Sequence, residues 1–384
     1  MKMTEKDYSL LLKSHRRTSH PFTMWESIHI APEILRGSLD DKVVEATKKA
    51  ASEIMKRGIE EIVFTGSGTS YFSGLVGEYG LAEVANMSAR YLTSHELKNY
   101  PPVVLGKKSA LVGISHSGNT LVILESTKLA RSMGAYTVAI TDVPDSPQEK
   151  AADIAIVGPG GRDWTIPKTR SYMSGIFRVM MLAAAIGDLK KPGTWDKWLK
   201  EFKRVPDVLA EAIKISDEKT PDIAKAFLKT RAFYCISFGV NVMTAQEASL
   251  KLLEGSLSMA LGLQAEEAIH GPLAAVDEKC ALVLIAPDGK GYERVERIAK
   301  GMHHFGIPIF AMGKPNAEIK KYADYFVGIP GDLPELLTPI VYIPTLYLLS
   351  YWIAVFNGIN PDILKSDNKK WVEAEAILMP PGSH

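Results

Sequence analysis

Short apolar runs alternate along the chain with longer stretches in which apolar residues recur every three or four positions. The runs "EEIVFTG", "SALVGIS" and "YTVAITD" are almost continuously apolar, which is typical of strands buried on both faces of a parallel sheet. Between them, "YFSGLVGEYGLAEVA" and "TLVILESTKLARSMG" show helical spacing, and the second ends at a glycine suited to a helix C-cap. The pattern therefore predicts an α/β fold in which helices cover both faces of a parallel sheet.

The chain also contains an internal duplication. "KSALVGISHSG", which starts at Lys108, matches "KCALVLIAPDG", which starts at Lys279. The same offset, from Lys108 to Lys279, also aligns "KAADIAIV" with "KYADYFVG" and "FTGSGTS" with "CISFGVN". Because three separate segments share one register, we predict two copies of one fold in tandem.

We expect each copy to form a doubly wound, flavodoxin-like three-layer sandwich. The region between the copies is polar and has helical spacing, which predicts a helical linker. The predicted division is an N-terminal arm at residues 1–45, a first domain at 46–190, a linker at 191–220, a second domain at 221–355 and a C-terminal tail at 356–384.

Composition narrows the classes of protein that fit this pattern. Of the 384 residues, 46% are hydrophobic and 23% are charged, which is typical of a soluble globular protein. The net charge of +1 comes without a basic stripe, so we expect neither nucleic acid nor a membrane as a partner. An apolar stretch at residues 338–359 is long enough to span a membrane, but it contains prolines and polar residues, and we predict a buried core helix.

The cysteines and the N-terminus bear on the cellular compartment. Cys235 and Cys280 are too few for a disulfide framework, and the N-terminal stretch lacks the long apolar core of a signal peptide. We therefore predict a cytoplasmic protein.

Two loops follow neighbouring predicted strands, "GSGTS" at residues 66–70 and "SHSGNT" at 115–120. At the carboxyl ends of parallel strands, helix N-termini point free N–H groups and positive partial charge outward. Ser115, Ser117 and Thr120 would add hydroxyl donors there, which is a way to hold a phosphomonoester without arginine. Serine, asparagine and glycine are also common in ordinary turns, so one such loop taken alone is weak evidence for binding.

The second copy differs at this loop. By the offset of the duplication, it carries Ala286 in place of Ser115 and Asp288 in place of Ser117, so two hydroxyls are lost and a carboxylate that would repel phosphate is gained. We predict that the first copy binds an anion and that the second does not.

The second copy carries candidate reacting groups instead. Glu247, Lys251 and Glu254 are spaced four and three residues apart, which places them on one face of a helix, either as a solvated salt-bridge stripe or as part of a site. His270 precedes Gly-Pro and is expected on a turn, where a histidine is structural or catalytic. Near one anion site, these groups would suit aldose–ketose chemistry, which needs an acid to open the ring and a base to move a proton between C1 and C2.

Together, "GSGTSYFSG", "ISHSGNT" and "EASLKLLE…IHGPLAAVD" resemble tandem sugar-isomerase (SIS) domain proteins. The resemblance is strongest to the isomerase half of glucosamine-6-phosphate synthase, also named glutamine–fructose-6-phosphate aminotransferase, and to related glucosamine-6-phosphate deaminases. It implies two tandem SIS domains. It also implies that the sugar phosphate is bound by Gly68, Thr69, Ser70, Ser115, His116, Ser117 and Thr120.

The same resemblance implies the catalytic roles. Glu254 matches the base that moves the proton, Lys251 a lysine that supports it, and His270 a histidine that assists ring opening in a neighbouring subunit. Lys369, or alternatively Lys370, matches the tail lysine that forms an imine with the ketose. A homodimer with a shared active site is therefore expected.

The chain departs from the synthase pattern at Lys168, where the synthase has a serine. This lysine adds a cation near the expected sugar pocket, unless it lies on the surface. No glutaminase segment with an N-terminal nucleophilic cysteine is present among these residues, so we expect no glutamine hydrolysis by this chain alone.

These observations predict conversion of glucosamine 6-phosphate to fructose 6-phosphate and ammonia. The alternatives are a fructosamine-6-phosphate deglycase, an isomerase subunit that depends on a separate glutaminase, and a non-catalytic sugar-phosphate sensor. No cofactor is predicted. We also predict no metal site, because the adjacent His303 and His304 point about 100° apart on a helix and make a poor chelate.

Overall fold

A computed structural model describes residues 17–380 of the chain. Residues 1–16, which hold most of the stretch used to predict that there is no signal peptide, and residues 381–384 lie outside the described part.

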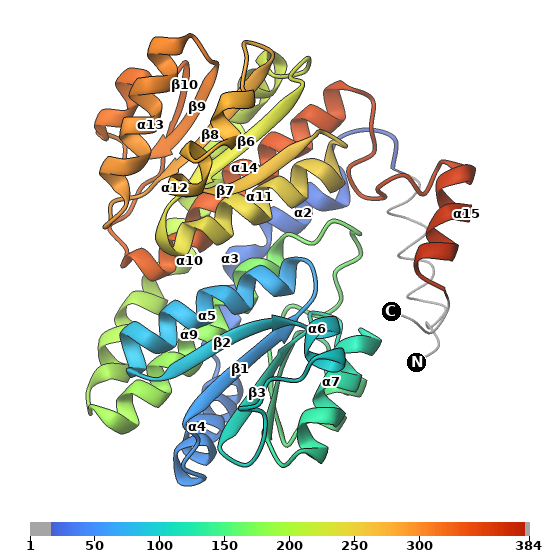
Figure 1. The fold of residues 1–384 in the computed structure, drawn as a ribbon, viewed down its shortest axis with the longest axis vertical. Helices are drawn as coiled ribbons and strands as arrows, with labels where there is room; N and C mark the ends of the chain where they lie inside the picture. Colours follow the sequence, from blue (N-terminus) through green and yellow to red (C-terminus); the bar gives the residue numbers. More distant parts are fainter. Residues whose placement is uncertain (1–16, 381–384) are drawn as a thin grey trace.

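Within residues 17–380, ten strands form two parallel sheets of five strands each, and Figure 1 shows the sheets in the lower and upper halves of the molecule. The order is β2-β1-β3-β4-β5 in the first sheet and β7-β6-β8-β9-β10 in the second. The first sheet comprises β1 (Glu61–Gly66), β2 (Ser88–Thr93), β3 (Ser109–Ile114), β4 (Tyr136–Thr141) and β5 (Ile154–Val157). The second comprises β6 (Ala232–Ser237), β7 (Ala260–Gln264), β8 (Cys280–Ala286), β9 (Ile309–Gly313) and β10 (Tyr325–Gly328).

The two sheets confirm the internal duplication. The first residues of β1 and β6 are separated by the offset found in the sequence, and so are the first residues of β3 and β8. Both sheets also have the 2-1-3-4-5 order of a flavodoxin-like fold. The α/β class with two parallel, helix-flanked sheets is confirmed. The division into an arm, two domains, a linker and a tail stays a prediction.

Helices flank both sheets. In the first half they are α2 (Thr23–His29), α3 (Ala31–Gly37), α4 (Asp41–Lys56), α5 (Thr69–Ala85), α6 (Ser94–Asn99), α7 (Leu121–Ser132), α8 (Pro147–Ala151) and α9 (Arg170–Lys190). After α10 (Thr194–Ala226) follow α11 (Val242–Gly255), α12 (Ala265–Ile269), α13 (Tyr292–Phe305), α14 (Thr338–Phe356) and α15 (Lys369–Leu378). The 3-10 helices are η1 (Gly239–Asn241), η2 (Pro272–Ala275), η3 (Glu318–Tyr322) and η4 (Glu335–Leu337).

Side chains of a strand alternate between two cores, as the continuous apolar runs require. On β1, Ile62 and Phe64 belong to the large core that the two halves share, whereas Val63 belongs to a small cluster under the opposite face. On β6, Phe233 enters the shared core and Tyr234 a separate outer cluster. Each sheet therefore has one face toward the other half of the molecule and one face toward its own outer helices.

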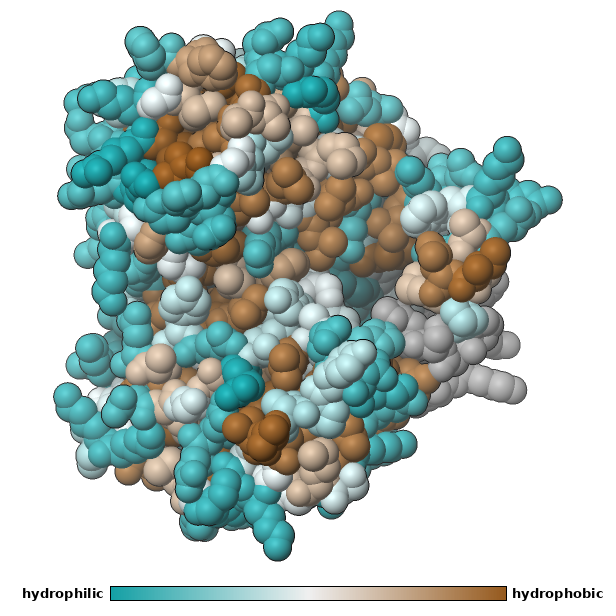
Figure 2. Space-filling model, in the orientation of Figure 1, coloured by the Kyte–Doolittle hydropathy of each residue, from teal (hydrophilic) through white to brown (hydrophobic). Residues whose placement is uncertain are grey.

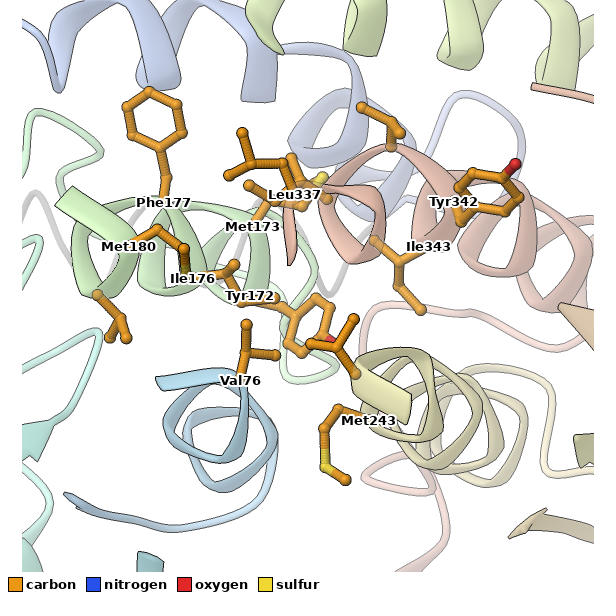
Figure 3. Close-up of a cluster of buried hydrophobic side chains, with 14 of the residues drawn as sticks. Val76, Tyr172, Met173, Ile176, Phe177, Met180, Met243, Leu337, Tyr342 and Ile343 are labelled. Atoms are coloured by element: carbon orange, nitrogen blue, oxygen red, sulfur yellow. The ribbon is translucent and has the colours of Figure 1, made fainter. Parts of the chain in front are cut away.

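The shared core lies where α5 and α9 meet α11 and α14. Figure 3 shows Val76 and Ile176 of the first half facing Met243 and Ile343 of the second. All four side chains are almost inaccessible to solvent. This packing fixes the N-terminal end of α5 against the C-terminal part of α11, and the candidate site is built there.

The region that we predicted to be a polar linker is the helix α10, which has 33 residues and continues to Ala226. It is amphipathic and not simply polar, because Phe202, Leu209 and Ile213 are buried in the shared core. Its buried face packs along α14, so α10 is part of the fold between the two halves.

Two helical segments in the described part of the chain are long and apolar enough to cross a membrane, Arg170–Lys190 and Glu335–Phe356. Of their most apolar windows, 89% and 83% are buried inside the protein. The prediction of a buried core helix at residues 338–359 is therefore confirmed for the helical part of that stretch, α14.

The tail projects from the body of the molecule. Figure 1 shows α15 standing beside the two halves, and Figure 2 shows the surface hollowed between the halves on the same side. The segment before α15 is anchored, because Asp362 accepts hydrogen bonds from the backbone N–H groups of Thr23 and Met24. The tail therefore leaves the body next to this hollow.

Candidate functional site

The two loops that we singled out, residues 66–70 and 115–120, lie side by side and are called here the first cradle. They follow β1 and β3, which are neighbours in the sheet, while α5 and α7 pack on opposite faces of it. This is the point where the strand order reverses and where open parallel sheets bind ligands. Gly68 has a left-handed φ of 55° and starts α5, and Thr120 is the N-cap residue of α7.

Hydrogen bonds inside the 115–120 loop hold its hydroxyl groups in place. Ser115 Oγ accepts a hydrogen bond from the N–H of Gly118 at 3.1 Å and lies 3.3 Å from Thr120 Oγ1. Ser117 Oγ accepts from the N–H of Asn119 at 3.2 Å. Gly118 has φ of 62°, and a Cβ at this position would overlap the side chain of Ser146. Only glycine therefore allows this loop to close.

His116 has a different role from the one that the resemblance implied for its side chain. Its Nδ1 lies 2.9 Å from Asp142 Oδ2, and its Nε2 accepts a hydrogen bond from the N–H of Asp163 at 2.9 Å. Both ring nitrogens are thus used inside the protein, and the residue is 9% exposed. The imidazole ties the first cradle to the 158–169 loop and has no nitrogen left for a phosphate.

A buried ion pair holds Asp142, the partner of His116, in place. Arg178 Nη2 lies 2.9 Å from Asp142 Oδ2, and both side chains are only 2% exposed. Burial alone would raise the pKa of Asp142, but Arg178 and His116 outweigh it and hold that pKa well below its usual range. Asp142 is therefore a fixed negative charge under the first cradle.

The predicted reacting groups meet the first cradle through Thr69. Lys251 Nζ donates a hydrogen bond to Thr69 Oγ1 at 3.0 Å, donates another to Glu254 and lies 3.4 Å from Glu247 Oε1. Burial alone would lower the pKa of Lys251, but Glu247 and Glu254 outweigh it and raise that pKa. Lys251 is a charged and fully buried clamp, so the alternative of a solvated salt-bridge stripe on α11 is wrong.

Glu247, which the sequence places on the same face of α11 as Lys251 and Glu254, carries a buried carboxyl group. Its Oε1 accepts hydrogen bonds from Tyr347 at 2.9 Å and from Thr69 at 3.3 Å, while its Oε2 has no hydrogen-bond partner. Burial and the negative charge of Glu254 raise its pKa to about 7, although Lys251 opposes this rise. The helical spacing in the sequence indicates that Glu247 shares a helix face with Lys251 and Glu254. It cannot indicate the partner Tyr347, which lies 100 residues away in the sequence.

Glu247 should make stability depend on pH near neutrality. Its pKa is about 7 in the folded chain against 4.5 in the reference state, so its contribution is complete below pH 4.5 and is lost as the pH rises through 7. Glu247→Gln, which keeps an acceptor for Tyr347, should remove this loss, which is on the order of 3 kcal/mol. Urea unfolding of the unaltered chain and of Glu247→Gln at several pH values measures this loss. If the free energies of unfolding of the two proteins changed with pH in parallel, the raised pKa of Glu247 would be contradicted.

Lys168 lies inside the site and not on the surface. Its Nζ donates hydrogen bonds to the backbone carbonyl oxygens of Asp163, at 2.9 Å, and Thr165. Burial lowers the pKa of Lys168; Asp163 opposes this effect, and the positive charge of Lys251 adds to it. The negative charge of Glu254 acts in the opposite direction and raises that pKa.

Two predicted catalytic residues stand apart from this cluster. His270 is exposed at the end of α12, and Lys369 is 92% exposed on α15, with its Nζ 4.0 Å from Glu373. Gln264, which caps α12, lines one pocket together with Gly239 and Val240, just before the N-terminus of α11. Glu254 lies at the opposite end of α11, about 18 Å away by the helical rise.

The equivalent loops of the second copy, around Gly239 and Gly289, form a second cradle that is already filled. Glu335 places its carboxylate between them, and a Cβ on Gly289 would lie 2.6 Å from Glu335 Oε1, against 3.3 Å for Gly239. The backbone N–H of Lys290 donates to the same carboxylate. A Cβ on Gly68, the counterpart of Gly239, would have no atom within 4 Å. The second cradle contains a carboxylate of the protein itself, whereas no such group lies beside Gly68 in the first.

Comparisons with known proteins agree with this geometry. Residues 57–185, which include the first sheet and the first cradle, match the SIS domain family. This part of the chain is therefore similar to a SIS domain. Over 345 residues the chain is 32% identical to glutamine–fructose-6-phosphate aminotransferase (isomerizing) of Pyrococcus horikoshii, covering 88% of this chain and 56% of that protein. The chain therefore spans little more than half the length of this relative.

Solved structures share the fold. The C-terminal domain of glucosamine-fructose-6-phosphate aminotransferase from Francisella tularensis aligns with a TM-score of 0.81 and 23% identity, over 90% of this chain and 98% of that one. Glucosamine-6-phosphate deaminase from Thermotoga maritima aligns with a TM-score of 0.66 and 20% identity, over 84% and 97% of the two chains. The resemblance that we identified from the sequence motifs is confirmed.

Proposed function

We propose that this chain is a sugar-phosphate isomerase that acts on an amino-sugar phosphate, converting glucosamine 6-phosphate to fructose 6-phosphate and ammonia. The observation that carries the proposal is the contact between Thr69 of the open first cradle and Lys251, which holds Glu254. A phosphate in the cradle would bring the carbon atoms of the same molecule toward a carboxylate. The names of the relatives support a sugar phosphate as the ligand.

The proposed chemistry uses the site as follows. The N–H groups and hydroxyls of the first cradle, including those of Ser70 and Thr120, hold the phosphate at two helix N-termini. Glu254 moves the proton between C1 and C2, and the ammonium group of Lys251 keeps that carboxylate in position. No metal or cofactor takes part in the proposal, and the cytoplasmic location stays a prediction.

The second cradle supports the anion part of the proposal. There, the same arrangement of two glycine loops surrounds the carboxylate of Glu335. Burial and the nearby Glu83 raise the pKa of Glu335, while the N–H of Lys290 lowers it. Since one copy of the fold places a negative group of its own at this point, the open copy is suited to a negative group from outside.

We also propose a homodimer in which His270 completes the site of the partner subunit. His270 stands at the C-terminal end of α12, and no hydrogen bond or ion pair joins it to Glu254 among the described residues. Its exposed position is suitable for contact with another subunit. The partner, like the exact sugar, remains part of the proposal.

An activity screen tests the proposed reaction. Glucosamine 6-phosphate, fructose 6-phosphate with ammonium, and 6-phosphofructosamines should be supplied separately while ammonia and ketose are followed. We expect ammonia and fructose 6-phosphate from the first substrate. Release only from 6-phosphofructosamines would favour the deglycase alternative. Binding of fructose 6-phosphate without any product would indicate a sensor, and synthesis that needs an added glutaminase protein would indicate a subunit.

Gly118→Ala should weaken phosphate binding. The new Cβ would overlap Ser146 and push the N–H groups of the loop out of position. The loss of one charge-assisted hydrogen bond corresponds to a decrease in affinity of about 10- to 100-fold. Calorimetric titration with fructose 6-phosphate measures it. Gly358→Ala is the matched control, because Gly358 has a similar φ of 69° with open space around it. Equal weakening in both variants would contradict a cradle-specific effect.

A further inference from the structure

The proposed function leaves open which amine of this chain reacts with the sugar at C2. Three lysines are candidates by their place in the sequence motifs or the structure: Lys168, Lys251 and Lys369. A nucleophilic amine must be uncharged, must keep its lone pair free and must stand close to the carbon that reacts. These three conditions distinguish the candidates.

Lys251 does not meet the first two conditions. Its Nζ faces Thr69 Oγ1, Glu254 and Glu247, so three acceptors surround the three protons of an ammonium group. The two carboxylates keep it charged. Lys251 therefore serves to hold Glu254 and has no lone pair for attack.

Lys369 does not meet the third condition in this chain. It is the first residue of α15, and its side chain is 92% exposed. Its nearest charged group is Glu373 of the same helix, at 4.0 Å. No residue of α15 is buried, so within one chain Lys369 lies in solvent and not against the acid–base pair.

Lys168 meets the geometric conditions. Its Nζ donates to two backbone carbonyl oxygens, those of Asp163 and Thr165. A neutral amine has two hydrogens and one lone pair, so two acceptors use both hydrogens and leave the lone pair directed away from them. Ser73 Oγ donates hydrogen bonds to the carbonyl oxygens of Thr69 and Tyr172, so the segment that follows Lys168 lies beside Thr69, the residue that Lys251 contacts.

The loop that carries Lys168 is fixed to the first cradle and to the tail. The N–H of Asp163 donates to His116 in the cradle, and Asp163 Oδ2 accepts from Ser27 Oγ at 3.0 Å. The N–H of Ile166 donates to the carbonyl oxygen of Asp362 at 3.0 Å. These bonds fix the loop that carries the amine relative to the first cradle, where the phosphate is proposed to bind. Covalent catalysis requires such fixed positioning.

Burial favours the uncharged form of the Lys168 amine. Burial lowers the pKa of Lys168, and Arg170 and Lys251 lower it further, while Asp163 and Glu254 act in the opposite direction. The same desolvation beside other cations activates lysine nucleophiles in general. The carboxylate of Asp163 is shared among several partners, because it accepts hydrogen bonds from Thr165 and Ser27 and lies 3.5 Å from Arg170 Nε.

We propose that Lys168 Nζ is the nucleophile that forms the imine with C2 of the substrate, a step that rests on the proposed function above. After Glu254 has moved the proton from C2 to C1, C2 is bonded to nitrogen as an imine. The lone pair of Lys168 attacks C2, the C2–N bond to the substrate nitrogen breaks, and that nitrogen leaves as ammonia with the two hydrogens that the amine of Lys168 gives up. Water then adds to C2 and expels Lys168 as the free amine, which yields the ketose.

Reductive trapping tests the assignment. The full chain is incubated with fructose 6-phosphate and sodium cyanoborohydride, which reduces imines, and the adduct is located by peptide mass spectrometry. We expect one phosphohexitol adduct on Lys168. Lys168→Arg keeps the charge and Lys168→Met keeps the length, and both should lose the adduct, while Lys369→Ala should keep it. An adduct on Lys369 or Lys370 would overturn the proposal.

A second measurement separates this proposal from the proposed function. In deuterium oxide, exchange of the substrate hydrogen at C1 reports proton transfer by Glu254 without an imine being required. Exchange or ammonia release in the absence of any adduct on Lys168 would reject Lys168 and leave the reaction intact. No exchange, no ammonia and no binding of fructose 6-phosphate would reject both. Folding of each variant is checked by the calorimetric titration, since the cradle should still bind phosphate.

Discussion

Replacing Glu254 with glutamine should lower the turnover number by about 10²–10⁴-fold, the range over which a positioned general base contributes to catalysis. Glutamine has nearly the same shape, and its carbonyl oxygen can still accept the hydrogen bond from Lys251. It cannot take up a proton. The loss should therefore appear in kcat and much less in KM, because the first cradle that binds phosphate is unchanged. Steady-state release of ammonia from glucosamine 6-phosphate measures both constants.

The control for this prediction uses the proposed dimer. Glu254→Gln and His270→Asn should each be inactive alone, because each removes one reacting group from every site. When the two variants are unfolded, mixed and refolded together, mixed dimers contain one site with both groups intact, and part of the activity should return. A Glu254→Gln chain with full turnover would contradict the role of Glu254, and a mixture without activity would contradict a shared site.

The sheets were predictable because strand and helix periods are local properties of the sequence. The duplication added the second sheet and its register, and β6 begins where the offset from Lys108 to Lys279 places it. Local patterns could not show that α5, α9, α11 and α14 form one core. That core depends on the fit of side chains from segments far apart in the sequence, such as Val76 and Met243.

The candidate site was predictable in its loops but not in the partners of its side chains. The motif "SHSGNT" indicated a cradle, yet it gave no sign that His116 would bond Asp142 and Asp163. One signal was available. Asp142 directly follows β4, the neighbour of β3, so it lies at the same edge of the sheet as the loop that contains His116. The filling of the second cradle by Glu335 had no such signal, because that residue comes from η4, outside the repeated strands.

Arg178→Met should destabilise the chain by about 3–5 kcal/mol, the cost of leaving a buried charge without its partner. Arg178 bonds Asp142 at 2.9 Å and the carbonyl oxygen of Thr141 at 2.7 Å, and its side chain is 2% exposed. Methionine fills much of the space but leaves the buried carboxylate of Asp142 without its guanidinium partner. Denaturant unfolding measures the free energy of unfolding, and a change below about 1 kcal/mol, within the range of ordinary surface substitutions, would contradict the argument.

The dependence on pH makes this prediction specific to Asp142. In the unaltered chain the pKa of Asp142 is lowered, so its contribution to stability is present above its unfolded value of 3.8 and is lost as the pH falls toward the folded one. Without Arg178, the largest charge that lowers the pKa of Asp142 is gone and that pKa rises, so acid should weaken the variant less. The double variant Arg178→Met with Asp142→Asn removes both charges and should recover part of the lost stability. Because Asp142 also holds His116, the single variant should bind fructose 6-phosphate more weakly than the double variant, since a carboxylate without its counter-ion lies under the cradle.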